Sequence, residues 1–296
     1  MLDYKLIEAL ALVAQDGGFD KAANTLHITQ SAVSQRVKLL EEQMGQILLA
    51  RTTPPRPTSA GRNLLKHYLQ VKRLEDDLFG EMNEHVDKEY KSIAVALNAD
   101  SMATWFFDAI QAFVLEEGIL LDIRVDDQEQ THRLLKNGEV VGCISTKDKP
   151  LQGCRIDYIG QMNYHMLAAP EFAKKWFPNG LTIADAYRAP AIIFNRKDEL
   201  HHKLFKLVLG EIPDNLPVNY IPSAEKFVDV IATGLGYGML PLQQSEPFIR
   251  TGRLVDLAPD YAVPVKLYWH CWNLKSKPLI KFTQQLIFRA KTLLDK

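Results

Sequence analysis

Two short helical segments joined by a tight polar turn constrain the fold of this chain more than any other feature. They occupy residues 19–44, FDKAANTLHITQSAVSQRVKLLEEQM. In the first segment the small residues Ala22 and Ala23 allow a neighbouring helix to pack closely. Thr29 follows the turn and is a favourable N-cap for the second segment, because its hydroxyl can accept a hydrogen bond from a free backbone amide. The pattern therefore predicts a helix-turn-helix.

The second helix is expected to carry two different faces. Apolar residues recur on one face at helical spacing and should point to the domain core: Val33, Val37, Leu40 and Met44. The opposite face and the helix start are polar, with an arginine at the margin: Thr29, Gln30, Ser31, Ser34, Gln35, Arg36 and Lys38. Side chains of this kind suit a recognition helix in the major groove of DNA. The alternative is an ordinary solvated face in a helical hairpin.

A proline-rich segment, TTPPRPTSAG at residues 52–61, follows the second helix. Its prolines fix the φ angle and remove backbone donors: Pro54, Pro55 and Pro57. This stiffness would hold Arg56 toward the DNA backbone or the minor groove, with Arg51 and Arg62 close by. Phosphate contacts of this kind position a domain without reading sequence.

Charge alone does not predict DNA binding. The net charge of the whole chain is -1. Residues 1–61 carry six basic side chains against six acidic ones: Lys5, Lys21, Arg36, Lys38, Arg51 and Arg56 against Asp3, Glu8, Asp16, Asp20, Glu41 and Glu42. Any binding to DNA must therefore depend on where the basic side chains are placed.

The first sixty residues resemble the winged helix-turn-helix of LysR-type transcriptional regulators. The residues that carry this resemblance match in order and in spacing: Leu10, Ala22, Ala23, Leu26, Thr29, Gln30, Ser31, Ala32, Val33, Ser34, Leu40, Glu41, Gly45, Leu48, Arg51, Thr58 and Gly61. Leu49 replaces the usual Phe and Asp20 the usual hydroxyl residue, although Leu remains apolar and Asp can still cap a helix. The resemblance implies double-stranded DNA and RNA polymerase as partners.

A long helical pattern from Arg62 to about His85 places apolar residues on one side: Leu64, Leu65, Tyr68, Val71, Leu74, Leu78 and Met82. This stripe can pack on its own domain, but a helix that extends between two domains more readily buries it against a second copy. The corresponding helix forms the dimer in LysR-type regulators, so the resemblance implies a homodimer that can pair into a tetramer. A two-fold dimer would place its recognition helices roughly 34 Å apart on DNA. We expect a short polar hinge at Val86 to Lys91.

Strand and helix patterns alternate from Lys91 onward, and this order predicts an α/β domain with mostly parallel sheets. The expected strands are residues 92–97, 119–125, 140–145, a segment from residue 156, 191–194 and 265–270. The expected helices are residues 101–115, 131–136, 224–233 and 279–294. This order resembles the effector domain of LysR-type regulators, a bilobed fold similar to that of periplasmic solute-binding proteins.

The predicted fold is therefore α+β overall, with three parts. A winged helix-turn-helix domain occupies residues 1–61, a linker helix and hinge residues 62–90, and an effector domain residues 91–296. Within the effector domain, lobe I should span about 91–163 and 266–296, and lobe II about 164–265.

An effector is expected between the lobes, where strand ends meet helix starts. At the Asn98 to Ser101 junction, free amides and the Ser101 hydroxyl suit a carboxylate, and a Ser or Thr at this place often holds the effector's carboxylate in the family. Asp100 or Ser101 could equally act only as an N-cap. The expected effector-binding residues come from this junction and from other segment ends: Asp100, Ser101, Asp127, Asn195, Ser223 and Glu225.

Acidic residues also follow the strand expected at residues 119–125, namely Asp126, Asp127 and Glu129. Carboxylates that face a cleft would attract a cationic effector. A solvated acidic loop is the alternative for each of them.

Several segments resemble a subgroup of LysR-type regulators that controls genes of arginine and lysine transport and metabolism: RTTPPRPT, NADSMATW, GEVVG, FPNG, SAEKFV and LYWH. That subgroup responds to basic amino acids, in agreement with the acidic residues near the expected cleft. The sequence therefore predicts a ligand-responsive transcriptional activator with lysine or arginine as effector. The alternatives are an architectural or replication-related DNA-binding protein without an effector, and an enzyme or small-molecule binder in which the N-terminal domain is incidental.

Other apparent motifs do not predict chemistry. Residues 234–238, GLGYG, resemble a dinucleotide fingerprint but follow a helix and precede a strand, the reverse of the Rossmann order. Histidines 201, 202, 165 and 270 lack metal-ligand spacing, and the last two fall in expected strands. Cysteines 143, 154 and 271 show no metal or redox spacing and are expected to be reduced core residues. We expect no catalytic residue, cofactor or metal site, and no enzymatic activity.

Length and composition are those of a soluble protein of about two domains. The chain has 296 residues, of which 47% are apolar and 24% charged, which excludes a disordered or membrane-embedded class. No apolar run approaches the ~18 residues of a membrane span. The start of the chain is interrupted by Asp3 and Glu8, unlike a signal peptide. We therefore expect a cytoplasmic protein without a membrane partner.

Overall fold

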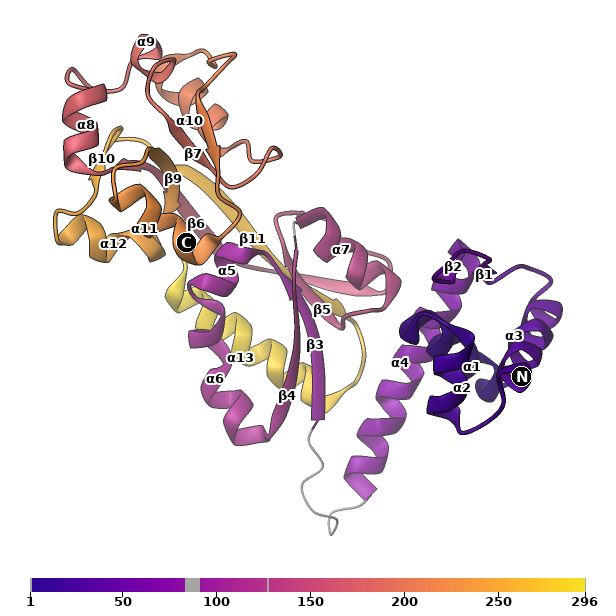
Figure 1. The fold of residues 1–296 in the computed structure, drawn as a ribbon. Helices are drawn as coiled ribbons and strands as arrows, with labels where there is room; N and C mark the ends of the chain where they lie inside the picture. The colour runs from indigo at the N-terminus through magenta and orange to yellow at the C-terminus, as the bar shows by residue number, and fades with distance from the viewer. Residues whose placement is uncertain (1, 83–90, 127, 296) are drawn as a thin grey trace.

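A helical N-terminal domain, a long helix and a larger α/β domain follow one another along the chain (Figure 1). The computed structural model describes residues 2–82, 91–126 and 128–295. The expected hinge lies outside the described residues except for Lys91, and Asp127 and the side chain of Glu129 lie outside them as well.

The predicted helix-turn-helix is confirmed. The N-terminal domain consists of α1 (Tyr4–Asp16), α2 (Phe19–Leu26), α3 (Gln30–Met44) and the antiparallel pair β1 (Leu49–Ala50) and β2 (Arg56–Pro57). Helix α2 ends at His27, which has a left-handed backbone with φ 53°. Thr29 caps α3, because its Oγ1 accepts a hydrogen bond from the amide of Ala32 at 3.2 Å.

The core of this domain contains most of the apolar face predicted for α3. Val33, Val37 and Leu40 are buried in one cluster with residues of α1 and α2. The prediction for Met44 is wrong, since it is 38% exposed. It occupies the last turn of α3, where the chain leaves the core and residues 42–47 are all exposed.

Helix α4 (Ser59–Met82) begins earlier than expected, and its apolar stripe divides in two. Leu64, Leu65 and Tyr68 are buried in the core of their own domain. The interpretation that the whole stripe packs on a second copy is therefore wrong for this half. The second half is exposed to solvent in the single chain: Leu74, Leu78, Phe79 and Met82. Only this second half remains for contact with another copy.

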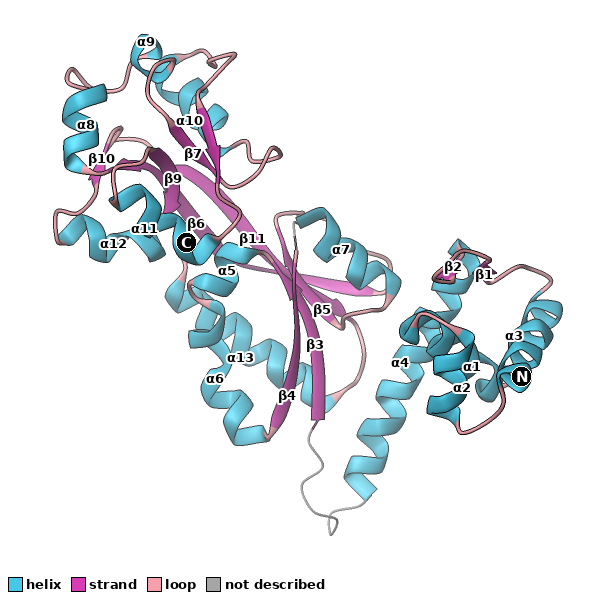
Figure 2. Cartoon of the chain, in the orientation of Figure 1, coloured by secondary structure: helices cyan, strands magenta, loops and turns pink. Residues whose placement is uncertain are grey.

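The first lobe of the C-terminal domain packs helices on both faces of its strands (Figure 2). It contains β3 (Lys91–Leu97), α5 (Ala99–Ala103), α6 (Phe106–Glu117), β4 (Ile119–Val125), α7 (Gln128–Asn137), β5 (Gly142–Ser145) and α13 (Lys277–Leu293). Alternate residues of β3 point to opposite sides, so Val95 joins the core under α6 and α13, while Ala96 joins the core under α7.

The single helix expected at residues 101–115 is instead split into α5 and α6. The break lies at Thr104, whose hydroxyl donates to the carbonyl oxygen of Asp100 at 2.6 Å. The backbone of Thr104 leaves the helical path there, with φ -118° and ψ -75°. The turn lets Trp105 enter the core, where it is almost fully buried.

The second lobe contains shorter elements. They are α8 (Pro170–Trp176), α9 (Ile183–Ala186), β7 (Ala191–Ile193), α10 (Leu200–Leu209), β8 (Val218–Tyr220), α11 (Ala224–Ala232), β9 (Tyr237–Pro241), α12 (Leu242–Arg250) and β10 (Val255–Asp256). The long strands β6 (Cys154–Ala168) and β11 (Val263–Trp272) run through both lobes.

The described strands of this domain form one mixed sheet in the order β4-β3-β5-β11-β6-β9-β7-β8, with β10 paired to β6. The expectation of mostly parallel sheets is correct only within each lobe, where β3 pairs with β4 and β5, and β7 with β8 and β9. The pairs made by β6 and β11 are antiparallel, because both strands cross between the lobes in opposite directions. The register of β6 with β11 shifts between Leu267 and Tyr268. No helix in the described ranges has the length and apolar character that crossing a membrane requires.

Candidate DNA-binding face and interlobe site

The polar face predicted for α3 is exposed on the surface of the N-terminal domain. Ser31, Ser34, Gln35 and Lys38 are all exposed, opposite the buried apolar residues of the same helix. Lys38 forms an ion pair with Glu42 at 3.7 Å, and the two side chains are 77% and 60% exposed. A pair this exposed contributes little free energy, so Lys38 can exchange Glu42 for a phosphate.

The residues at the start of α3 have a different role from those along its face. Thr29 Oγ1 caps the helix and lies 3.0 Å from Ser31 Oγ, so Thr29 orients the first turn. Gln30 is exposed beside it, whereas Arg36 is partly buried at the margin of the face. The assignment of these residues to DNA contact stays a prediction.

The wing, residues 48–57, presents two exposed arginines. Arg51 and Arg56 are exposed, and Arg56 pairs with Ala50 across the two short strands. Arg62, in α4, is exposed as well, and its guanidinium donates a hydrogen bond to the carbonyl oxygen of Pro57 at 2.8 Å. Its position therefore stabilises the wing backbone.

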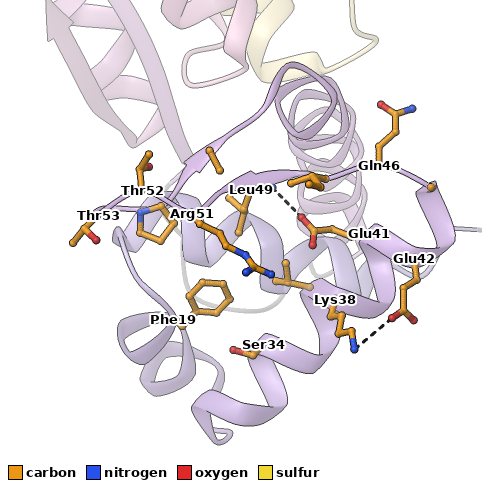
Figure 3. Close-up of a pocket in the computed structure, with 15 residues that line it drawn as sticks. Phe19, Ser34, Lys38, Glu41, Glu42, Gln46, Leu49, Arg51, Thr52 and Thr53 are labelled. Atoms are coloured by element: carbon orange, nitrogen blue, oxygen red, sulfur yellow. Dashed lines mark hydrogen bonds and ion pairs between the residues drawn. The ribbon is translucent and has the colours of Figure 1, made fainter.

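An open groove of about 930 Å³ separates α3 from the wing (Figure 3). It is lined by residues of α2, α3 and the wing: Phe19, Ser34, Val37, Lys38, Glu41, Glu42, Gly45, Gln46, Ile47, Leu49, Ala50, Arg51, Thr52, Thr53 and Pro55. One side of the groove carries Ser34 and Lys38, from the polar face of α3. The other side carries Arg51, from the wing. The groove thus brings these groups to the same side of the domain.

A buried polar group lies between the lobes of the C-terminal domain. The Tyr164 hydroxyl, on β6, donates a hydrogen bond to the Asp100 carboxylate, on α5, at 2.5 Å. Burial raises the pKa of Asp100, although this hydrogen bond acts in the opposite sense. Burial and the negative charge of Asp100 raise the pKa of Tyr164. Asp198, in the second lobe, adds a repulsive negative charge that raises the pKa of both groups.

Two further polar atoms of this region are buried and make no hydrogen bond to any described residue. They are the Ser101 Oγ, in a fully buried side chain, and the Asn98 Oδ1. The N-cap of α5 is Asn98, so the alternative that Asp100 or Ser101 is that cap is wrong. Buried polar atoms are rarely left without a hydrogen-bond partner.

The other expected effector residues are placed less favourably. Ser223 caps α11, its Oγ accepting from the amide of Lys226 at 3.4 Å, and Glu225 is exposed on the first turn. Helix α11 does contact α5 across the lobes, so both junctions lie at the interlobe boundary. The Asn195 side chain accepts from the amide of Lys197 at 2.8 Å within a turn. Asp127 lies outside the described residues.

Sequence reasoning missed Tyr164 and Asp198. Asp198 follows the end of β7 and accepts hydrogen bonds from the amides of Leu200 at 2.9 Å and Phe194 at 3.4 Å. The signal that selected Asn195, a polar residue after a strand, could have found Asp198 three positions later. No local signal distinguishes Tyr164 from other aromatic residues of a strand.

Histidines and cysteines outside this group are structural. His201 and His270 are fully buried, and His165 pairs with Asp256 at 2.9 Å. Burial raises the pKa of Cys143, Cys154 and Cys271, which are free thiols, Cys154 being only partly buried. Within the described part of the chain, no three His, Cys, Asp or Glu side chains are grouped to hold a metal ion. The glycine-rich run follows α11 and its last two residues, Tyr237 and Gly238, begin β9, in the helix-then-strand order that the sequence predicts.

A smaller groove of about 550 Å³ lies on the second lobe between α8 and the end of α11. Neither groove includes Asp100, Ser101 or Asp198. The interpretation of the interlobe site therefore rests on its buried polar atoms and charges.

Known protein families match both parts of the chain. Residues 4–62 match the bacterial regulatory helix-turn-helix proteins of the lysR family, and residues 91–286 match the LysR substrate binding domain. The chain therefore belongs to the LysR family of transcriptional regulators, whose members are DNA-binding regulators rather than enzymes.

Its relatives include regulators of one subgroup. The HTH-type transcriptional regulator ArgP of Pseudomonas aeruginosa (strain UCBPP-PA14) is 42% identical over 98% of this chain and 96% of that protein. The crystal structure of ArgP from Mycobacterium tuberculosis has a TM-score of 0.92 and 36% identity, and the match covers 100% of this chain and 99% of that chain. Full-length LysG from Corynebacterium glutamicum with bound effector Arg has a TM-score of 0.83 and 28% identity over 100% of both chains. The resemblance to this subgroup is confirmed.

Proposed function

We propose that this protein senses a basic amino acid between its lobes and activates genes of arginine or lysine transport and metabolism. The observation that carries the proposal is the hydrogen-bonded pair of the buried Tyr164 and the partly buried Asp100, beside the Ser101 hydroxyl, which has no partner among the described residues. LysG, which has a similar structure, is described with arginine bound as its effector.

The chemistry of the interlobe site matches the parts of a basic amino acid. The Ser101 Oγ can donate to an α-carboxylate, and the Asn98 Oδ1 can accept from an α-ammonium group. Asp100 and Asp198 repel each other, and a side-chain cation between them would remove that repulsion. We therefore add Asp198 to the residues proposed to bind the effector.

The ligand would act by changing how the lobes close. Asp100 belongs to the first lobe and Asp198 to the second, so a ligand that contacts both binds the closed arrangement more tightly. Only such a difference in affinity can shift the equilibrium between two arrangements. The shift would reach the DNA-binding domains through α4.

On DNA, α3 would read base edges and the wing would contact phosphates. The exposed half of α4, with Leu74, Leu78, Phe79 and Met82, would join two copies into a homodimer that can pair into a tetramer. The protein would act in the cytoplasm together with RNA polymerase.

Calorimetry with lysine, arginine, ornithine and norleucine tests the effector. Norleucine keeps the carboxylate and an apolar chain but lacks the terminal cation, so we expect much weaker binding than for the three basic amino acids. Equal binding of norleucine would contradict the role of the acidic pair. Binding of none of the four would favour an architectural DNA-binding protein without an effector.

A further inference from the structure

The connection between α3 and the wing depends on one acidic side chain of the recognition helix. The Glu41 Oε1 accepts hydrogen bonds from two consecutive wing amides, that of Leu48 at 2.7 Å and that of Leu49 at 3.1 Å. Figure 3 shows the second of these bonds. Glu41 is only partly buried and lies one turn beyond Val37 and Lys38. It is thus on the same helix as the expected base-reading residues.

The wing has few other means of holding its orientation. Its strands contain two residues each, and the prolines at positions 54, 55 and 57 cannot donate to a ladder. On the side of α4, Thr58 makes two hydrogen bonds to this segment. Its backbone amide donates to the carbonyl oxygen of Leu48 at 2.9 Å, and its side-chain hydroxyl donates to the carbonyl oxygen of Ile47 at 2.8 Å. Residues 47–49 are therefore fixed to α4 by Thr58 and to α3 by Glu41.

The two attachments are not equivalent. Gly61 approaches the Leu48 carbonyl so closely that an added Cβ would lie 2.1 Å from the oxygen, so the α4 side is held by close packing as well. On the α3 side, the Glu41 carboxylate bridges directly to the backbone at the edge of the groove. Arg51 follows two residues after Leu49, so the direction of β1 determines where this arginine points.

We propose that Glu41 is a positioning residue for DNA binding, which holds the wing at the distance from α3 that lets both contact one DNA segment. Glu41 would not touch DNA itself, since its Oε1 is already occupied by the two amides. Without this bridge, the reading face of α3 would remain intact while the wing arginines lose their fixed position.

The amide of Gln offers a matched control for the carboxylate of Glu. Both bonds go to a single oxygen, so Glu41→Gln retains an acceptor for both amides and removes only the charge. Glu41→Met has a similar length but no comparable acceptor. Glu41→Asp keeps the charge but is one methylene shorter, so it should reach at most one amide.

The test measures operator binding by the full-length protein as a function of salt concentration. We expect Glu41→Gln to behave as wild type, while Glu41→Met and Glu41→Asp bind more weakly and with a flatter salt dependence. The slope of log K against log salt should fall by about 0.9 for each phosphate that the wing no longer reaches. A separate readout is amide hydrogen exchange, which should become faster at Leu48 and Leu49 in Glu41→Met and Glu41→Asp but not in Glu41→Gln.

Two results would overturn the proposal. Equal reductions of affinity in Glu41→Gln and Glu41→Met would show that the charge, and not the hydrogen-bond acceptor, matters. Weaker binding by a folded Glu41→Met with an unchanged salt slope would show that the wing contacts do not depend on Glu41. If Glu41→Met fails to fold, the affinity and salt slope of Glu41→Asp are compared with those of Glu41→Gln, and the same criteria apply.

Discussion

The reading face of α3 and the interlobe site arrange polar side chains in opposite ways. Ser34 and Gln35 are exposed on one helix, where water satisfies them until DNA arrives. Asp100 and Ser101 lie among buried groups brought together from distant segments, and the Ser101 hydroxyl has no described partner. In the proposed function, the first arrangement meets a large partner at the surface and the second encloses a small one. The two sites should therefore respond to different substitutions.

The largest effect on DNA binding should come from dissociating the homodimer. Operator binding requires both copies, whereas ligand binding between the lobes requires only one. Leu78 is 54% exposed in the single chain, and Leu78→Asp would bury a charge at the expected seam. Sedimentation should show monomers, and operator affinity should fall on the order of a thousandfold toward the non-specific level. Asp76→Ala, on the opposite face of the same helix, should remain dimeric. A dimeric Leu78→Asp with normal affinity would show that this half of α4 is not the seam.

Removal of one base-reading side chain should have the next largest effect. Gln35→Ala should weaken binding to the specific operator by about 1 to 3 kcal/mol and binding to random DNA much less. An operator selected from random-sequence DNA allows both to be measured by fluorescence anisotropy. Equal weakening on the two DNAs would contradict the orientation of α3, and weaker lysine binding would contradict the separation of the two sites.

A smaller effect should come from acid, and only in the C-terminal domain. Burial lowers the pKa of His201 from 6.5 to about 4, so the folded state holds this side chain neutral. Its contribution to stability is complete above pH 6.5 and is lost as the pH falls toward 4. His201 by itself should lower the free energy of unfolding by roughly 2 kcal/mol between about pH 7 and pH 5. Burial also lowers the pKa of His132 and His270, so the whole domain should lose more.

Urea unfolding at the two pH values checks this expectation. His201→Gln should make the pH dependence shallower by this contribution, because glutamine does not titrate. An unchanged pH dependence in His201→Gln would show that other groups control acid stability.

The smallest effect should come from the wing. Arg56→Ala removes one exposed cation, so it should weaken specific and random DNA similarly and reduce the salt slope by about 0.9 if this cation neutralises one phosphate. A weakening confined to the specific operator would show that Arg56 reads sequence instead.

The contrast between the local face of α3 and the interlobe site, which distant segments form, also explains how much the sequence could predict. Helical spacing in one short segment was sufficient to place Thr29, Val33 and Gln35, because their relation depends only on local geometry. Tyr164 lies 64 positions after Asp100, and no periodicity links them. Antiparallel pairing of β6 with β11 brings the lobes together, and this pairing was not deducible from strand patterns alone.

Met44 and the division of α4 were missed for a related reason. Spacing shows which residues share a face, but it does not show where the neighbouring element ends. Met44 continues the apolar face beyond the core, and Leu64 and Leu78 share a stripe although only Leu64 packs in its own domain. The number of copies that assemble, and the position at which a neighbouring element ends, depend on the three-dimensional structure. Local spacing in the sequence therefore does not predict them.

Lysine binding to three proteins, measured by calorimetry, tests the separation of the two sites most directly. Asp198→Asn keeps an oxygen that can accept from the Leu200 amide but loses the charge proposed to bind the cation. We expect Gln35→Ala to bind lysine as wild type does, and Asp198→Asn to bind at least about tenfold more weakly, a difference of about 1.4 kcal/mol. Wild-type affinity in Asp198→Asn, or a reduced affinity in Gln35→Ala, would contradict the separation.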